Sequence, residues 1–146
     1  MSYWDTSTLI KLYVQESDSL LFENHAASST DKIVISQIGV YEARGTFLRK
    51  EIDGMLHPNA ANVLSSRLQM DIVSGQIEII DLTADVEREY ARVMDACYRT
   101  SPPILLRTLD AIHIASCRLS NQKELVVTDK RLRDAAQQLA IPLFPV

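Results

Sequence analysis

The feature of this sequence that most constrains its fold is an alternation of short apolar runs with helical patterns. The segment from Arg107 to Asp129 is the clearest example. Its first part carries apolar residues at helical spacing, whereas Leu125, Val126 and Val127 form a short apolar run that ends at a polar break. The segment therefore predicts a helix that leads into a buried strand.

The same alternation extends along the rest of the chain. Further strand candidates are residues 2–4, 32–35, 77–80 and 141–144. Helical patterns lie between them at 9–13, 20–27, 36–50, 58–73, 83–99 and 132–139. Ser36 and Thr83 are the expected N-caps of two of these helices. Strands that alternate with helices predict an α/β fold, a three-layer α/β/α sandwich with a central parallel sheet.

Composition and charge narrow the class of protein. The 146 residues are 47% hydrophobic and 23% charged, which is typical of one soluble globular domain, here residues 1–146. Cys97 and Cys117 lie in helical patterns as small apolar residues, so we expect a reduced, cytoplasmic protein. No uncharged apolar run approaches the roughly 18 residues of a membrane span, so we expect no membrane association. The net charge of -4 argues against a broad nucleic-acid-binding surface.

Four acidic residues lie next to the ends of the predicted elements. Asp5 follows the first strand and Asp129 follows the fourth. Asp110 lies in the first turn of the helix before the fourth strand, and Glu42 lies about one turn into the helix after the second strand. Ligands of open α/β sheets bind beyond the carboxyl ends of the strands. We therefore expect these four carboxylates to converge at one end of the sheet.

Each acidic position also has a purely local interpretation. Asp5 or Thr6 could serve only as a helix cap, which is the common role of Asp and Thr before an apolar helix. Asp110 is an anion that the helix N-terminus favours. Glu42 is a boundary residue that pairs with Arg49 or extends to solvent. The sequence alone leaves these alternatives open.

A cluster of carboxylates favours a bound cation, because like charges raise one another's pKa and burial adds to the cost. An all-oxygen ligand set predicts Mg2+, with Mn2+ as the alternative, whereas zinc usually recruits His or Cys. His113 lies one turn after Asp110 and is a candidate ligand or base. No second His or Cys sits nearby at ligand spacing, so a core or boundary role is the better interpretation of His113.

Four motifs in this order resemble a known family. They are Trp-Asp-Thr-Ser-Thr-Leu-Ile-Lys-Leu-Tyr at 4–13, the stretch 36–44 with Glu42, Arg-Thr-Leu-Asp-Ala-Ile-His-Ile-Ala at 107–115, and Val-Val-Thr-Asp-Lys-Arg-Leu at 126–132. With these motifs the chain resembles the PIN-domain ribonucleases, and specifically the VapC-like toxins of type II toxin-antitoxin pairs. The resemblance covers essentially the whole chain.

The resemblance implies a Mg2+-dependent endoribonuclease with a PIN-like fold. Asp5, Glu42, Asp110 and Asp129 match the acidic quartet that binds metal and carries catalysis in this family, and Ser7 matches a supporting polar residue. Many relatives have Thr or Ser two residues before the last aspartate. Here Val127 takes that place and Thr128, the other candidate supporting residue, directly precedes Asp129. The resemblance also implies an RNA substrate, a cognate antitoxin protein and a homodimer.

The mechanism expected from such a site is in-line attack of water on an RNA phosphodiester. Without the quartet the rest of the chain is formally neutral, so the net acidity is compatible with an RNA substrate. Basic residues that could position phosphates near the site are Arg44, Arg49, Lys50, Arg107, Lys130, Arg131 and Arg133.

Two other functions compete with the ribonuclease. A phosphatase of the haloacid dehalogenase type also uses an aspartate after its first strand, but it needs a second acid where this chain has Ser7. The alternative that remains is a non-catalytic PIN-like module that binds RNA or protein. A metal-dependent RNA cleavage assay separates this module from the enzyme.

Overall fold

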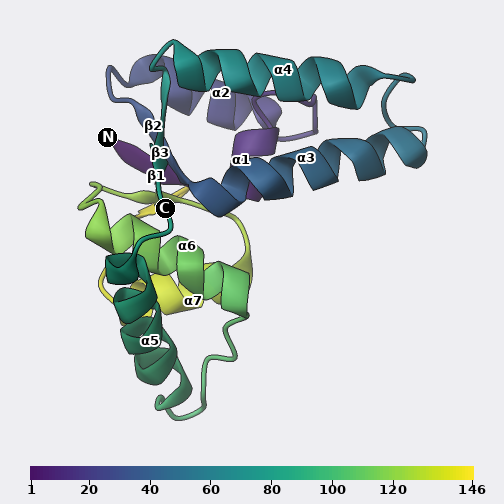
Figure 1. Cartoon of the computed structure of the whole chain (residues 1–146). Helices are drawn as coiled ribbons and strands as arrows, with labels where there is room; N and C mark the ends of the chain where they lie inside the picture. The colour runs from purple at the N-terminus through teal and green to yellow at the C-terminus, as the bar shows by residue number, and fades with distance from the viewer.

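A parallel sheet lies between two layers of helices (Figure 1). The computed structural model describes residues 1–146. The strands are β1 (Ser2–Trp4), β2 (Ile33–Ser36), β3 (Ile77–Ile80), β4 (Leu125–Val126) and β5 (Leu143–Phe144). They pair in the order β3-β2-β1-β4-β5, and every pair is parallel. The three-layer α/β/α sandwich predicted from the sequence is confirmed.

Each face of the sheet is covered by its own group of helices. The first group is α1 (Thr6–Ile10), α2 (Ser19–Ser28), α3 (Gln37–Ile52) and α4 (Ala60–Val73). The second group is α5 (Ala84–Tyr98), α6 (Thr108–Leu119) and α7 (Lys130–Gln138). Figure 1 shows α1 to α4 on one side of the sheet and α5 to α7 on the other. Two separate hydrophobic cores result.

The central strand β1 is buried on both of its faces. In β1, Tyr3 packs into the core beneath α5 to α7, whereas its neighbour Trp4 packs into the core beneath α1 to α4. The two side chains are 0% and 1% exposed. This division follows from the two-residue period of a strand, which sends successive side chains to opposite faces.

The direction in which the chain winds places a crevice beside β1. The chain runs outward from β1 to β2 and β3, and then crosses back to place β4 on the other side of β1. The segments that follow β1 and β4 therefore diverge at the carboxyl end of the sheet, which is where such folds bind ligands. The Asp5 N–H and the Thr8 hydroxyl donate to the Val126 carbonyl at 3.1 and 2.8 Å. These bonds hold the start of α1 against β4.

The element boundaries lie within two residues of the sequence patterns except in α1. The helix expected over 9–13 begins at Thr6 and ends at Ile10, because the next residues form tighter i to i−3 bonds, such as Tyr13 N to Ile10 O at 2.9 Å. Strand β4 ends at Val126, one residue before the end of the predicted run at Val127. The Val127 N–H still donates to the Phe144 carbonyl at 2.9 Å. The expected N-caps at Ser36 and Thr83 are confirmed.

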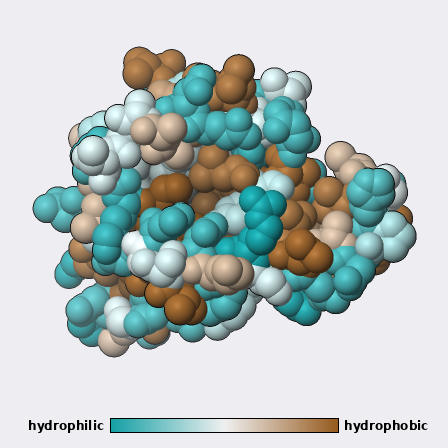
Figure 2. All heavy atoms as spheres, turned by 90° about the horizontal axis from the view of Figure 1, so that it is seen from above, coloured by the Kyte–Doolittle hydropathy of each residue, from teal (hydrophilic) through white to brown (hydrophobic).

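The surface carries apolar side chains among polar ones. On α4, the exposed residues include Val63, Met70 and Val73. Figure 2 shows the molecule from the side of α4, with hydrophobic areas visible between hydrophilic ones. None of the helices has the length and apolar character needed to cross a lipid bilayer.

Candidate active site

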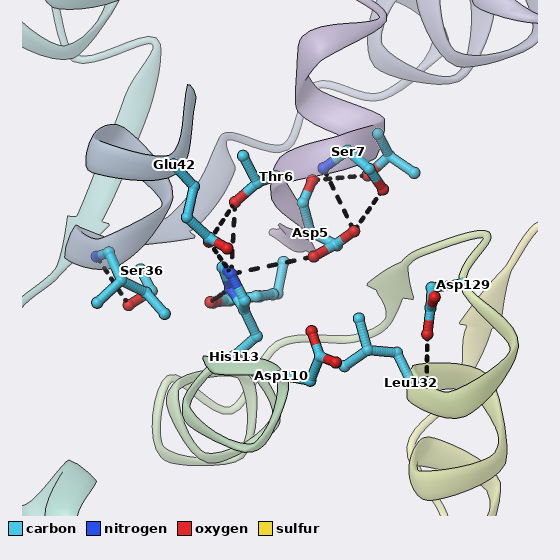
Figure 3. Close-up of polar contacts among 12 residues, drawn as sticks. Asp5, Thr6, Ser7, Ser36, Glu42, Asp110, His113, Asp129 and Leu132 are labelled. Carbon is cyan, nitrogen blue, oxygen red and sulfur yellow. Dashed lines mark hydrogen bonds and ion pairs between the residues drawn. The ribbon is translucent and has the colours of Figure 1, made fainter. Parts of the chain in front are cut away.

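The four acidic residues singled out by the sequence line one cavity of about 480 Å3. They come from four separate segments: Asp5 from the end of β1, Glu42 from α3, Asp110 from α6 and Asp129 from the start of α7. Figure 3 shows the carboxylates of Asp5, Asp110 and Asp129 facing one space, with Glu42 beside His113. The convergence expected from the sequence is therefore present.

Asp5 is both a helix cap and a member of this cavity. Its Oδ2 accepts hydrogen bonds from the Ser7 hydroxyl at 2.5 Å and from the Ser7 N–H at 3.3 Å. The residue is 6% exposed. The local interpretation of Asp5 was therefore correct without excluding the functional one, since capping uses only one of the two carboxylate oxygens. Ser7 supports Asp5, as the family resemblance implies.

Asp110 and Asp129 are each also held by a hydrogen bond to one carboxylate oxygen. Asp110 lies in the first turn of α6, is 7% exposed, and accepts a bond on Oδ2 from Arg107 Nε at 2.8 Å. Asp129 is the N-cap of α7, where its Oδ1 accepts from the Leu132 N–H at 3.1 Å. Thr128 is exposed and makes no hydrogen bond to Asp129. The supporting role predicted for Thr128 therefore has no counterpart here.

Glu42 has partners that the sequence did not indicate. Its Oε1 accepts from the Thr6 hydroxyl at 2.8 Å and lies 2.5 Å from Nε2 of His113. The predicted partner Arg49 instead donates to the Thr46 hydroxyl at 3.2 Å. The local interpretation of Glu42 as a partner of Arg49 was wrong. Packing of α3 against α1 and β2, and of α6 against β2, brings Glu42 to His113, and no local pattern encodes that contact.

One oxygen of each carboxylate is fixed by the protein, and the other has no hydrogen-bond partner within it. The fixed atoms are Asp5 Oδ2, Glu42 Oε1, Asp110 Oδ2 and Asp129 Oδ1. The free carboxylate oxygens suit a hard divalent cation such as Mg2+ or Mn2+. As they stand, no three acidic, His or Cys side chains are close enough to form a complete metal site. The type of donor atom nevertheless fits such a cation.

Burial and charge shift the pKa values around the cavity. Burial raises the pKa of Asp5, and the nearby His113 only partly opposes this. Burial would also raise the pKa of Glu42, but its hydrogen bond and charge interaction with His113 lower it. Burial works against protonation of His113, yet the hydrogen bond to Glu42 and the charges of Asp5, Glu42 and Asp110 raise its pKa.

Comparison with known proteins identifies the family. The PIN domain family matches the sequence over residues 2–138. The chain belongs to the PIN domain family. A search of the curated proteins gave no significant match.

Solved structures with the same fold include toxin-antitoxin proteins. FitAcB from Neisseria gonorrhoeae superimposes on this PIN domain with a TM-score of 0.71 at 18% identity, covering 99% of this chain and 96% of that one. VapC20 from Mycobacterium tuberculosis, a toxin that cleaves the Sarcin-Ricin loop, gives 0.70 at 16% identity, covering 92% and 95%. VapBC2 from Rickettsia felis, bound to promoter DNA, gives 0.68 at 17% identity, covering 98% and 97%.

The basic residues divide into those at the cavity and those away from it. Arg49, Lys50 and Arg107 line the cavity of this PIN domain. Arg44 lies on α3 but lines a different depression. Of the α7 residues, Lys130 pairs with Asp134, and Arg133 donates to the Val127 carbonyl. Only three of the seven basic candidates thus face the acidic residues.

Sequence reasoning undervalued His113. The residue is buried, as the core interpretation requires, but its ring contacts Glu42 and lies 4.0 Å from Asp5 Oδ1. Its position one turn after Asp110 on α6 was the available signal. Thr6, which bonds to the same Glu42 oxygen, gave a signal only as a possible cap.

The raised pKa of His113 predicts a pH-dependent contribution to stability in this PIN domain. A group whose pKa is raised in the folded state stabilises the fold fully at pH values below its unfolded pKa, about 6.5 for His. This contribution to the unfolding free energy is lost as pH rises through the folded pKa. Because the pKa of Glu42 is lowered, Glu42 contributes to the unfolding free energy at pH values above its unfolded pKa of about 4.3. The loss of unfolding free energy in His113→Leu, measured by denaturant melts in chelator, should therefore be larger at about pH 6 than at about pH 8.5. A loss that is constant or grows with pH contradicts this assignment.

Proposed function

We propose that this protein is a metal-dependent endoribonuclease, the toxin component of a type II toxin-antitoxin pair. The observation that carries the proposal is the set of four carboxylates at one cavity, each with one oxygen fixed and one free. Membership of the PIN domain family and the shared fold of VapC20, a toxin that cleaves RNA, support it.

The proposed cofactor is Mg2+, with Mn2+ as a substitute. Asp5, Asp110 and Asp129 would hold it directly, and Glu42 directly or through water. When bound, the cation lowers the pKa of water and offsets charge that develops on the phosphate. Water then attacks phosphorus in line, the ester bond on the opposite side breaks, and the leaving oxygen takes up a proton. No side-chain nucleophile is needed.

The cationic side chains at the cavity would bind the RNA backbone. Arg49 and Lys50 lie on α3, and Arg107 lies at the start of α6, so cations from two elements line a cavity that also holds the carboxylates. Phosphate contacts from Arg and Lys fix the position of a nucleic acid without reading its sequence. The rest of the surface can then remain acidic overall.

The proposed protein partners are a cognate antitoxin and a second copy of the chain. Relatives of the same fold were solved as toxin-antitoxin complexes. Exposed apolar side chains, such as Val63, Met70 and Val73 on α4, are typical of surfaces that bind other proteins. A mass of one chain at micromolar concentration, by size-exclusion chromatography with light scattering, would rule out the homodimer. The free cysteines are consistent with the proposed cytoplasmic location.

The direct test of the proposal is an RNA cleavage assay with inhibitor-free protein. The panel should contain transfer RNA and ribosomal RNA, including the Sarcin-Ricin loop, with Mg2+, with Mn2+ and with chelator. Cleavage that requires the divalent cation supports the enzyme. An intact panel in all three conditions favours the non-catalytic PIN-like module instead.

Asp110→Asn separates a functional carboxylate from a structural one. The change removes repulsion from neighbouring carboxylates and weakens the pair with Arg107, which is 66% exposed and so contributes little. We expect RNA cleavage to be abolished, while the unfolding free energy in chelator equals that of the parent or rises slightly, because carboxylate repulsion is removed. If Asp110 is only a structural residue, stability should fall by about 0.5 to 2 kcal/mol and cleavage should persist.

Arg49→Ala tests the proposed phosphate contact, with Arg44→Ala as the matched control. Both arginines are exposed on α3, but only Arg49 lines the acidic cavity. Arg49→Ala should raise the KM for RNA and reduce the slope of log KM against log salt concentration by about 0.7 to 1, because one phosphate contact is lost. Arg44→Ala should leave both quantities unchanged. Equal effects of the two changes would exclude a specific contact by Arg49.

A further inference from the structure

Tyr3, His113 and Glu42 form a chain of contacts from the core to the edge of the cavity. The Tyr3 hydroxyl lies 2.8 Å from Nδ1 of His113, and Nε2 of His113 lies 2.5 Å from Oε1 of Glu42. Tyr3 and His113 are 0% and 1% exposed, whereas the Glu42 side chain is 30% exposed. These contacts therefore connect the central strand of the sheet to a carboxylate at the cavity.

The contact with Glu42 places a proton on Nε2 of His113. Glu42 is an acceptor when ionised, so Nε2 carries a proton and donates it. In the neutral ring, Nδ1 then accepts from the Tyr3 hydroxyl. His113 does not line the cavity. It therefore cannot touch a substrate there, and it can affect the site only through Glu42.

A second donor and a close helix contact complete the arrangement. The Thr6 hydroxyl donates to the same Glu42 oxygen at 2.8 Å and lies 3.3 Å from Nε2 of His113. Gly39 lies three residues before Glu42 on α3, on the same face of the helix. A Cβ at Gly39 would come within 3.3 Å of the Thr6 hydroxyl and 3.7 Å of the His113 ring. The glycine thus allows α3 to approach both donors closely.

We propose that His113 is a positioning residue which, together with Thr6, fixes Oε1 of Glu42 and so directs Oε2 toward the cation and water at the three aspartates. This inference rests on the proposed function. Ligating carboxylates are commonly oriented by hydrogen bonds from a second layer of residues. Here that layer is built from β1, α1 and α6, so the orientation of Glu42 depends on how these elements pack.

The test compares His113→Leu with His113→Gln, in which a side-chain amide can replace the Nε2 donor. Three quantities are measured: the Mg2+ concentration at half-maximal thermal stabilisation, kcat for RNA and KM for RNA. His113→Leu should raise the Mg2+ requirement and lower kcat, each by about 10- to 100-fold. KM should change little, since His113 makes no contact at the cavity. His113→Gln should recover most of both losses.

Ser116→Ala is the matched control. Ser116 lies on the same helix, is 0% exposed and has a hydroxyl without a hydrogen-bond partner, so the change perturbs the core but not Glu42. If His113→Leu does not fold, Thr6→Val replaces it, because this nearly isosteric change removes the other donor to Oε1. A smaller loss in the same direction is expected from Thr6→Val.

The outcomes separate this inference from the proposed function. A wild-type protein that neither binds Mg2+ nor cleaves RNA overturns both. A wild-type protein that does both, with His113→Leu or its replacement Thr6→Val matching Ser116→Ala in Mg2+ requirement and kcat, overturns only the positioning role. The inference stands when kcat and the Mg2+ requirement change together, KM does not, and His113→Gln restores them.

Discussion

Mutual repulsion among carboxylates at one end of the sheet is the constraint on which the site depends. Two carboxylates at about 5 Å repel by roughly 3 kcal/mol at an effective dielectric constant near 20. Asp5 and Asp129 cannot move apart freely, because they follow strands that pair side by side and are buried on both faces. The fold therefore concentrates negative charge at the crevice beside β1. Basic side chains that lie outside the strands offset this charge.

The offsetting groups come from the two helical layers. Arg107, directly before α6, pairs with Asp110, and Arg49 and Lys50 of α3 line the same cavity. His113 is the only buried basic side chain in contact with the quartet, and that contact raises its pKa. Each anchored carboxylate retains one free oxygen. This pattern keeps the side chains ordered and leaves one oxygen of each for the proposed cation.

Features that depend on neighbouring residues could be predicted from the sequence, and features that depend on packing could not. The cap at Asp5, the first-turn position of Asp110 and the strand before Asp129 are local, so periodicity and cap preferences were sufficient. The contact between Glu42 and His113 joins residues 71 apart in the chain. It depends on how α3 and α6, on opposite faces of the sheet, each pack against β2, and Gly39 shows its effect only once that packing is known.

The central claim is that water, activated at this acidic site, hydrolyses RNA. The most direct measurement is cleavage in water labelled with oxygen-18, with Mg2+ and separately with chelator, followed by mass spectrometry of the RNA ends. The account predicts cleavage only with Mg2+, with one labelled oxygen on each new terminal phosphate and no cyclic phosphate. Cleavage that persists in chelator and leaves an unlabelled 2′,3′-cyclic phosphate would show attack by the RNA's own 2′-hydroxyl and would contradict it.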